Sequence, residues 1–143
     1  MRRLRLLLNE SFEIPTAVKI DPGCGWSDDA RMHVNYFAMF CMEGLGIPNL
    51  PQIEIVAQRI GGMTTGAYDP ATHKILVLGG SRALADVLRT LAHELTHYRQ
   101  RLQNKIKSTK RDWEIEGEAD AEAGKMVYTY AHTVPENMAI YDL

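Results

Sequence analysis

The sequence predicts an α+β fold, in which a short twisted sheet with an edge hairpin packs against two or three helices. Two observations support this prediction. Strand patterns, the last two joined by a turn, occur at residues 3–8, 17–21, 52–60, 64–69 and 74–78. Helical spacing of apolar residues occurs at 27 to 44 or 46, at 81 to about 106 and at about 111–132. The fold class follows from this mixture of elements.

The helix boundaries are marked by local signals. Ser27 stands before Asp28 and Asp29, which predicts an N-cap followed by an acidic first turn. Ser81 follows two glycines and is expected to cap the second helix. Pro135 follows the third helix and is expected to come after its end.

Length and composition indicate a single globular domain spanning residues 1–143. The chain is 45% hydrophobic and 24% charged, which is close to the average of globular proteins. No apolar run approaches the ~18 residues of a membrane span. The apolar run that follows Arg5 stops at Asn9, which argues against a signal peptide. We therefore expect a cytoplasmic or virion-associated protein.

Charge is distributed in two neighbouring blocks. Basic residues without acids occupy 99–111, and acidic residues without bases occupy 112–122. Such blocks are typical of solvated helix faces and helix ends. The formal net charge is -2, and the sequence has no helix-turn-helix pattern, so we do not expect a nucleic-acid partner.

The second predicted helix contains a motif that carries metal chemistry. Its residues are His93-Glu94-Leu95-Thr96-His97, an HExxH pattern. Positions four apart on a helix differ by only about 40° in azimuth, so the two imidazoles project together. The pair can share one zinc ion, while Glu94 stands beside the metal and can hold a water bound to it.

The helical wheel separates this motif from the apolar face of the same helix. With His93 placed at 0°, the apolar side chains fall between about 120° and 220°. These are Leu84, Val87, Leu88, Leu91, Leu95, Tyr98 and Leu102. His97 lies near 40°, on a second face that also holds Thr90 and Gln100. The histidines are therefore not members of the predicted core stripe.

A catalytic zinc requires a third protein ligand. The other histidines are His33, His73 and His132. A carboxylate from the last helix is favoured instead, because Glu116 shares its face with small and apolar residues. That stripe consists of Ala119, Ala123, Met126, Val127, Tyr130 and Ala131. Glu114, Glu118 and Glu122 fall on the other side of the wheel, near Lys125.

Asp120 lies four residues after Glu116 and faces the same way. Its expected role is to accept a hydrogen bond from the ring N–H of a ligand histidine. The sequence thus predicts one Zn²⁺ per chain, bound by His93, His97 and Glu116 and supported by Asp120.

The HExxH motif, followed nineteen residues after His97 by Glu116, resembles the gluzincin zinc metallopeptidases. Their third ligand is a glutamate in an ExxxD or ExxAD pattern on a following helix. The spacing of Glu116, Ala119 and Asp120 is particularly similar to minigluzincins and to phage-associated or HtpX-like soluble peptidase domains. The resemblance covers residues 64–127 and implies a small zincin-like fold.

The resemblance implies zinc-dependent endopeptidase activity on a peptide or protein substrate. Glu94 would be the catalytic base. Family members carry an edge strand before the active-site helix, along which the substrate lies antiparallel, and Gly66, Ala67 and Tyr68 occupy that place. The transmembrane helices of the HtpX-like branch have no counterpart here, so membrane substrates are not implied.

Two points stay open in the sequence. The first is the donor for the tetrahedral oxyanion, for which the candidates are Tyr68, Tyr98, Tyr128 and His132. The second is function itself: the alternative to a peptidase is a zinc-binding structural or interaction component of a larger assembly, such as a phage particle, with partner proteins and little proteolysis of its own.

Overall fold

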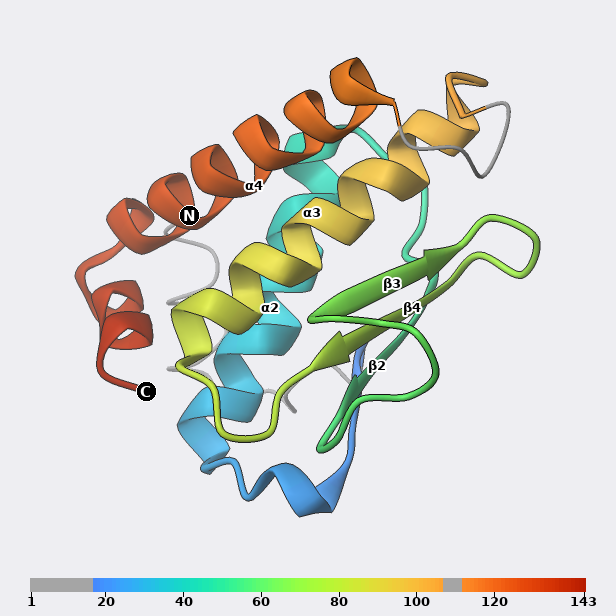
Figure 1. The fold of residues 1–143 in the computed structure, drawn as a ribbon. Coiled ribbons are helices and arrows are strands. Elements are labelled where there is room, and N and C mark those ends of the chain that lie inside the picture. Colours follow the sequence, from blue (N-terminus) through green and yellow to red (C-terminus); the bar gives the residue numbers. More distant parts are fainter. Residues whose placement is uncertain (1–16, 107–111) are drawn as a thin grey trace.

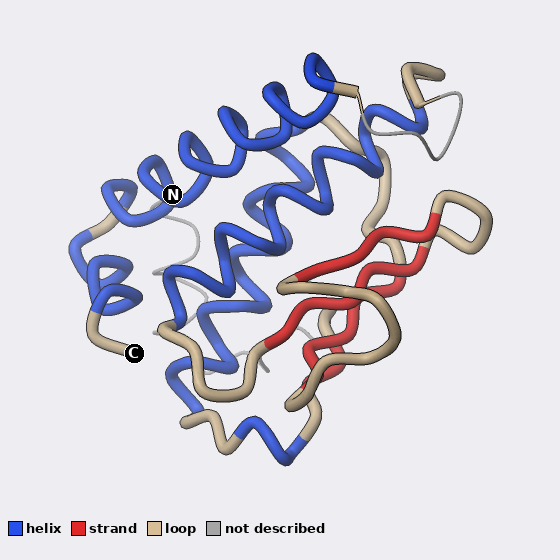
Figure 2. The backbone as a smooth tube through the Cα atoms, viewed as in Figure 1, coloured by secondary structure: helices blue, strands red, loops and turns tan. Residues whose placement is uncertain are grey.

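The computed structural model describes residues 17–106 and 112–143, which form a four-stranded mixed sheet with α-helices packed on one of its faces (Figures 1 and 2). The elements in chain order are β1 (Lys19–Ile20), the 3-10 helix η1 (Pro22–Cys24), α2 (Asp28–Leu45), β2 (Gln52–Val56), β3 (Gly66–Asp69), β4 (Lys74–Leu78), α3 (Leu84–Leu102), α4 (Trp113–Thr133) and the 3-10 helix η2 (Pro135–Tyr141). The predicted α+β class is confirmed. The strand expected at 3–8 lies outside the described residues.

The strands are ordered β1-β2-β4-β3. β1, β2 and β4 are parallel, while β3 runs antiparallel to β4 and closes the predicted hairpin, with Gly66 opposite Val77 and Asp69 opposite Lys74. β3 is therefore an edge strand within the described part of the chain. It is the strand that lies beside α3 in Figure 1.

The core is formed by the sheet together with α2, α3 and α4. Alternate residues of β2 and β4 are buried, as expected for strands with one face on a core. They meet the apolar face of α3, whose Leu84, Val87, Leu88, Leu91 and Leu95 are each at most 2% exposed. The predicted stripe is confirmed except at Leu102, which is 47% exposed near the end of the helix.

α4 covers the side of α3 that faces away from the sheet (Figure 1). Its predicted inner stripe is confirmed, because these residues are all buried: Ala119, Ala123, Met126, Val127, Tyr130 and Ala131. The two alanines at 119 and 123 have little bulk, so the helices approach closely. This packing brings the first turns of α4 against the second half of α3.

Several predicted boundaries are wrong. β2 ends at Val56 instead of residue 60. Ser27 caps α2 as predicted, accepting from Ala30 N, but Ser81 does not cap α3. Ser81 has a left-handed φ of 57°, whereas an N-cap residue is extended, and Ala83 takes that position without a side-chain cap. α3 stops at Leu102, four residues early.

None of the described helices combines the length and the apolar character that crossing a bilayer requires.

Candidate metal centre

Three side chains from α3 and α4 converge on one point. His93 Nε2 and His97 Nε2 are 3.0 Å apart, and the carboxylate of Glu116 lies 3.1 Å from the first and 3.4 Å from the second. One ligand atom from each residue lies within 4.8 Å of the other two. α3 provides both imidazoles from successive turns of one face, and the close packing of α4 provides the carboxylate.

These distances fit a zinc ion. Ligand atoms at about 2.0–2.1 Å from a tetrahedral ion are about 3.3 Å from one another. The Nε2–Nε2 separation of 3.0 Å, and the separations of 3.1 Å from His93 Nε2 to Glu116 Oε2 and of 3.4 Å from His97 Nε2 to Glu116 Oε1, lie close to that value. Two imidazole nitrogens and one carboxylate oxygen are also a donor set that zinc prefers. The residues present therefore fit the ion that the motif predicts.

The ring of His93 is oriented by Asp120. Its Nδ1 lies 2.8 Å from Asp120 Oδ1. An ionised carboxylate only accepts hydrogen bonds, so this contact places the proton on Nδ1 and leaves the Nε2 lone pair free. Asp120 thus lies where its predicted supporting role requires, although its side chain is 75% exposed.

The ring of His97 is oriented by Gln100, a residue whose role the sequence analysis missed. His97 Nδ1 lies 2.8 Å from Gln100 Oε1. The amide of the fully buried Gln100 is held in this orientation because its Nε2 donates to Ile115 O at 3.0 Å and to Glu118 Oε1 at 2.9 Å. Its oxygen must therefore face His97, which places that proton on Nδ1.

As neutral rings, both histidines consequently present Nε2 lone pairs to each other and to Glu116. The two Nε2 atoms are 3.0 Å apart, and they lie 3.1 and 3.4 Å from Oε2 and Oε1 of Glu116, so the acceptor atoms of these three residues repel one another unless a proton or a cation lies between them. A divalent cation satisfies all three at once. The hydrogen bonds on the far sides of the two rings therefore favour a metal site over an isolated cluster of polar residues.

We expect Asp120→Ala to weaken zinc binding by roughly 10–100-fold, because His93 loses the acceptor that orients it. Zinc affinity, measured by competition with a chromophoric chelator, checks this value. The fold should persist, since the side chain of Asp120 is largely exposed. Unchanged affinity in the variant would contradict the role given to Asp120.

Glu94 lies beside the three ligands without joining them. Glu94 is 8% exposed. Its side chain approaches the edge strand at Gly66. A Cβ at that glycine would lie 3.2 Å from Glu94 Oε1 and 2.6 Å from Thr90 Cγ2. Only glycine leaves this room, so Gly66 allows Glu94 to sit between α3 and β3. Burial, and secondly the charge of Glu116, raise the pKa of Glu94 to about 8. A cation at the ligands would oppose the effect of Glu116.

The predicted substrate strand is β3. Gly66 stands next to Glu94, and Tyr68 packs edge-on against Tyr98 of α3 with ring centroids 6.2 Å apart. Ala67 lies between them, opposite Leu76 of β4. β3 therefore runs alongside the candidate metal centre.

The four candidates for the oxyanion donor lie elsewhere or are already engaged. Tyr68 OH is 2.8 Å from His73 Nδ1, and burial raises the pKa of Tyr68 to about 12. Tyr98 is buried and donates to Asn49 Oδ1, as the prediction of a core residue implies. Tyr128 and His132 stack on each other near the far end of α4.

Glu118 has a different place from the one predicted. The wheel put it near Lys125, away from the site. In the structure it accepts from Gln100, pairs with Lys105 at 3.4 Å and lies 3.7 Å from Arg99. Glu118 therefore supports His97 through Gln100. Gln100 shared the histidine face of the wheel, and that placement was the only signal available in the sequence.

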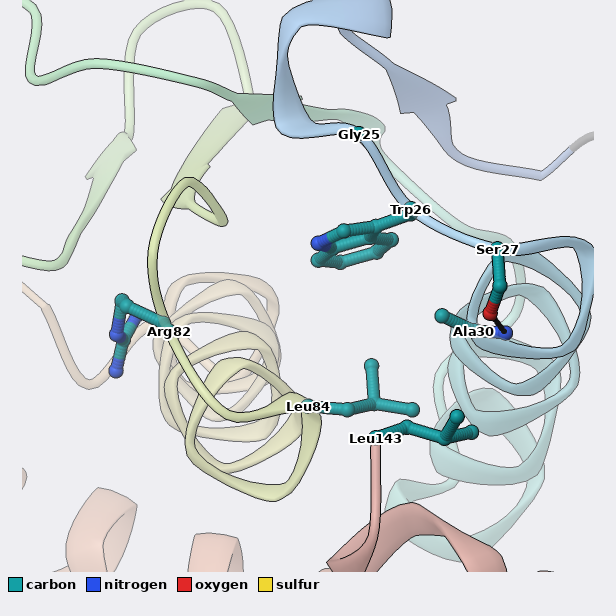
Figure 3. Close-up of a pocket in the computed structure, with 7 residues that line it drawn as sticks. All are labelled: Gly25, Trp26, Ser27, Ala30, Arg82, Leu84 and Leu143. Carbon is teal, nitrogen blue, oxygen red and sulfur yellow. Dashed lines mark hydrogen bonds between the residues drawn. The ribbon is translucent and has the colours of Figure 1, made fainter.

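A separate pocket lies at the N-terminal end of α2 and is lined by Gly25, Trp26, Ser27, Ala30, Arg82, Leu84 and Leu143 (Figure 3). None of these residues belongs to the metal cluster, so the pocket is no part of this site.

Comparison of the chain with protein-family models, with curated proteins and with solved structures gives no match.

Proposed function

We propose that the chain is a zinc-dependent endopeptidase of the gluzincin type. The observation that carries the proposal is the convergence of His93, His97 and Glu116, with Glu94 beside them but outside the group of ligand atoms. Three protein ligands leave a fourth tetrahedral position open, as catalytic zinc sites do.

The chemistry assigned to the residues follows from their places. Zinc, when bound, supplies a Lewis acid for the scissile carbonyl and lowers the pKa of water. Glu94 accepts the proton of the attacking water, whose oxygen bonds to the carbonyl carbon. Glu94 then delivers that proton to the departing amine as the C–N bond breaks. His93 and His97 keep their Nδ1 protons through Asp120 and Gln100.

The free edge of β3 supports a peptide substrate. An extended peptide can add to an exposed strand through main-chain hydrogen bonds, and within the described residues β3 pairs with β4 alone. Gly66 brings this edge next to Glu94. A peptide held there would pass over the base and the ligands together.

The alternative, a zinc-binding structural component of a larger assembly, is disfavoured by the same geometry. Structural zinc sites have four protein ligands, whereas the group in the described residues has three. A structural site also has no use for a buried carboxylate that does not coordinate the ion. Glu94 is such a carboxylate.

The proposal is tested by metal removal and restoration. We expect cleavage of a broad peptide library by the purified chain, loss of cleavage after treatment with a chelator, and recovery on adding one equivalent of Zn²⁺. Mass spectrometry of the products measures each step. Cleavage that survives complete removal of the metal would contradict the proposal, because Glu94 alone does not polarise the carbonyl.

A further inference from the structure

Arg89 of α3 lies one helical turn before His93 and occupies space that α4 leaves open. A Cβ at Gly124 would lie 3.0 Å from Arg89 Nη2, so the guanidinium rests directly over this glycine. Gly124 comes one turn after Asp120, which contacts His93. Arg89 and Gly124 therefore form the next layer of the α3–α4 contact after His93 and Asp120. Arg89 is exposed, and no carboxylate of the described residues pairs with it.

A second guanidinium is held near the start of β3. Arg82 donates to Leu78 O at 2.8 Å, to Asp86 O at 3.2 Å and to Thr90 Oγ1 at 3.0 Å. All three acceptors are neutral, so the positive charge is fixed in place without being neutralised by them. Thr90 in turn approaches Gly66. Figure 3 shows the side chain of Arg82, at the border of the separate pocket, pointing away from Trp26.

Two charged side chains influence Arg82. Burial lowers the pKa of Arg82, and the nearby carboxylate of Asp86 partly offsets this effect. Arg59, whose Nε donates to Thr64 O, lowers the pKa of Arg82 by less. Within the described residues, no ion pair joins Asp86 to Arg82 or Arg89. Arg82 therefore has a carboxylate and a second arginine nearby, but its hydrogen bonds go to neutral acceptors.

The direction of β3 relates these arginines to a bound peptide. β3 and α3 run the same way, because Gly66 lies beside Thr90 and Glu94, whereas Tyr68 lies beside Tyr98. Antiparallel pairing is the more stable way to add a peptide to an edge strand. The part of such a peptide that follows the bond next to Glu94 then extends toward the first turns of α3. Arg82 and Arg89 lie at that end.

We infer that Arg82 and Arg89 form a carboxylate subsite for the residues that follow the scissile bond. The inference rests on the proposed function and specifies its substrate class. The carboxylate can belong to an acidic side chain or to a free peptide C-terminus, because both present the same two oxygens to a guanidinium. The enzyme therefore prefers peptides with a negative charge just downstream of the bond that is cut.

The test measures peptide binding and does not require turnover. Zinc-loaded Glu94→Gln protein is titrated with fluorescent peptides that differ only in the two residues at their downstream end. One pair compares Glu with Gln in an amidated peptide, and another compares a free C-terminus with an amide. We expect roughly tenfold tighter binding of each charged member, equivalent to about 1.4 kcal/mol. The two pairs distinguish a side-chain carboxylate from a chain terminus.

Two variants on the Glu94→Gln background, each with a control variant, assign the preference to residues. Arg89→Gln should remove most of it, while Arg31→Gln, which changes an exposed arginine of α2, should keep it. Gly124→Ala should reduce it by less, because the added methyl group at 3.0 Å from Nη2 shifts the guanidinium only slightly. Gly117→Ala is the matched control, since a Cβ there meets nothing within 4 Å. Both glycine changes favour the helix and should not unfold it.

The outcomes separate this inference from the proposed function. Equal binding of charged and neutral peptides, or a preference that survives Arg89→Gln, overturns the subsite. Arg89→Gln is also made in the active protein. If it slows the cleavage of neutral and charged peptides by the same factor, Arg89 acts on the oxyanion and the subsite is again rejected. A charge preference in binding without cleavage of any peptide supports the subsite and rejects the endopeptidase.

Discussion

Replacing Glu116 with alanine is expected to abolish stoichiometric zinc binding. Glu116 supplies the only carboxylate of the converging group, and without it two histidines on one helix remain. The loss should exceed the roughly 100-fold upper range typical of residues that only orient a ligand, such as Asp120. Metal analysis after dialysis, together with competition against a chelator, measures both effects on one scale.

Glu114→Ala is the matched control for this experiment. Glu114 lies in the same first turn of α4, is exposed, and has no contact with the ligands. Zinc affinity in that variant should equal that of the unmodified chain. Glu118→Ala should have an intermediate effect, because Glu118 holds the amide of Gln100 against His97. Equal losses in the Glu114 and Glu116 variants would contradict the assignment of Glu116 as a ligand.

The arrangement of the centre was accessible from sequence because it depends on helix geometry. The rotation per residue of an α-helix is fixed, so the placement of His93 and His97 follows from their spacing alone. The same regularity placed Glu116 and Asp120 on one face of the last helix. The apolar stripes then indicated which faces of the two helices pack, and the structure brings these faces together.

Other features depended on contacts that spacing does not encode. The role of Gln100 requires Ile115 O and Glu118 from α4, and their positions depend on how the chain returns after α3. The wheel placed Glu118 outward because a wheel does not include the length of a side chain or a partner on another helix. Ser81 carried the signal of an N-cap, but its left-handed backbone moves the start of α3 beyond it.

The oxyanion donor is a further case of this kind. Tyrosines were candidates because of their hydroxyl groups, but burial and hydrogen bonding decide whether a hydroxyl is free to act. Tyr98 is engaged with Asn49, and Tyr68 with His73. The first joins α3 to a loop distant in sequence, and the second joins β3 to the turn of its own hairpin. No periodicity along the chain could have revealed them.

Glu94→Gln is expected to retain zinc and to lose hydrolysis. Gln has the shape of Glu and fits the same space beside Gly66, so the edge strand should stay in place. It can still hydrogen-bond a water, but it does not accept the water's proton. General bases contribute typically ~10²–10⁴-fold, and we expect a loss of turnover in that range. Peptide cleavage and zinc content, measured on the same samples, check the two parts of the expectation.

The two measurements together identify what Glu94 does. Lost zinc as well as lost cleavage would mean that Glu94 supports the ligands instead of acting on water, against its position outside the converging group. Equal cleavage by the variant and the unmodified chain would reject Glu94 as the base. Retained zinc with no cleavage by either protein would favour the structural alternative, because the centre would then bind its ion and lack a reaction. Retained zinc with cleavage by the unmodified chain alone is the result that burial of Glu94 between α3 and β3 predicts.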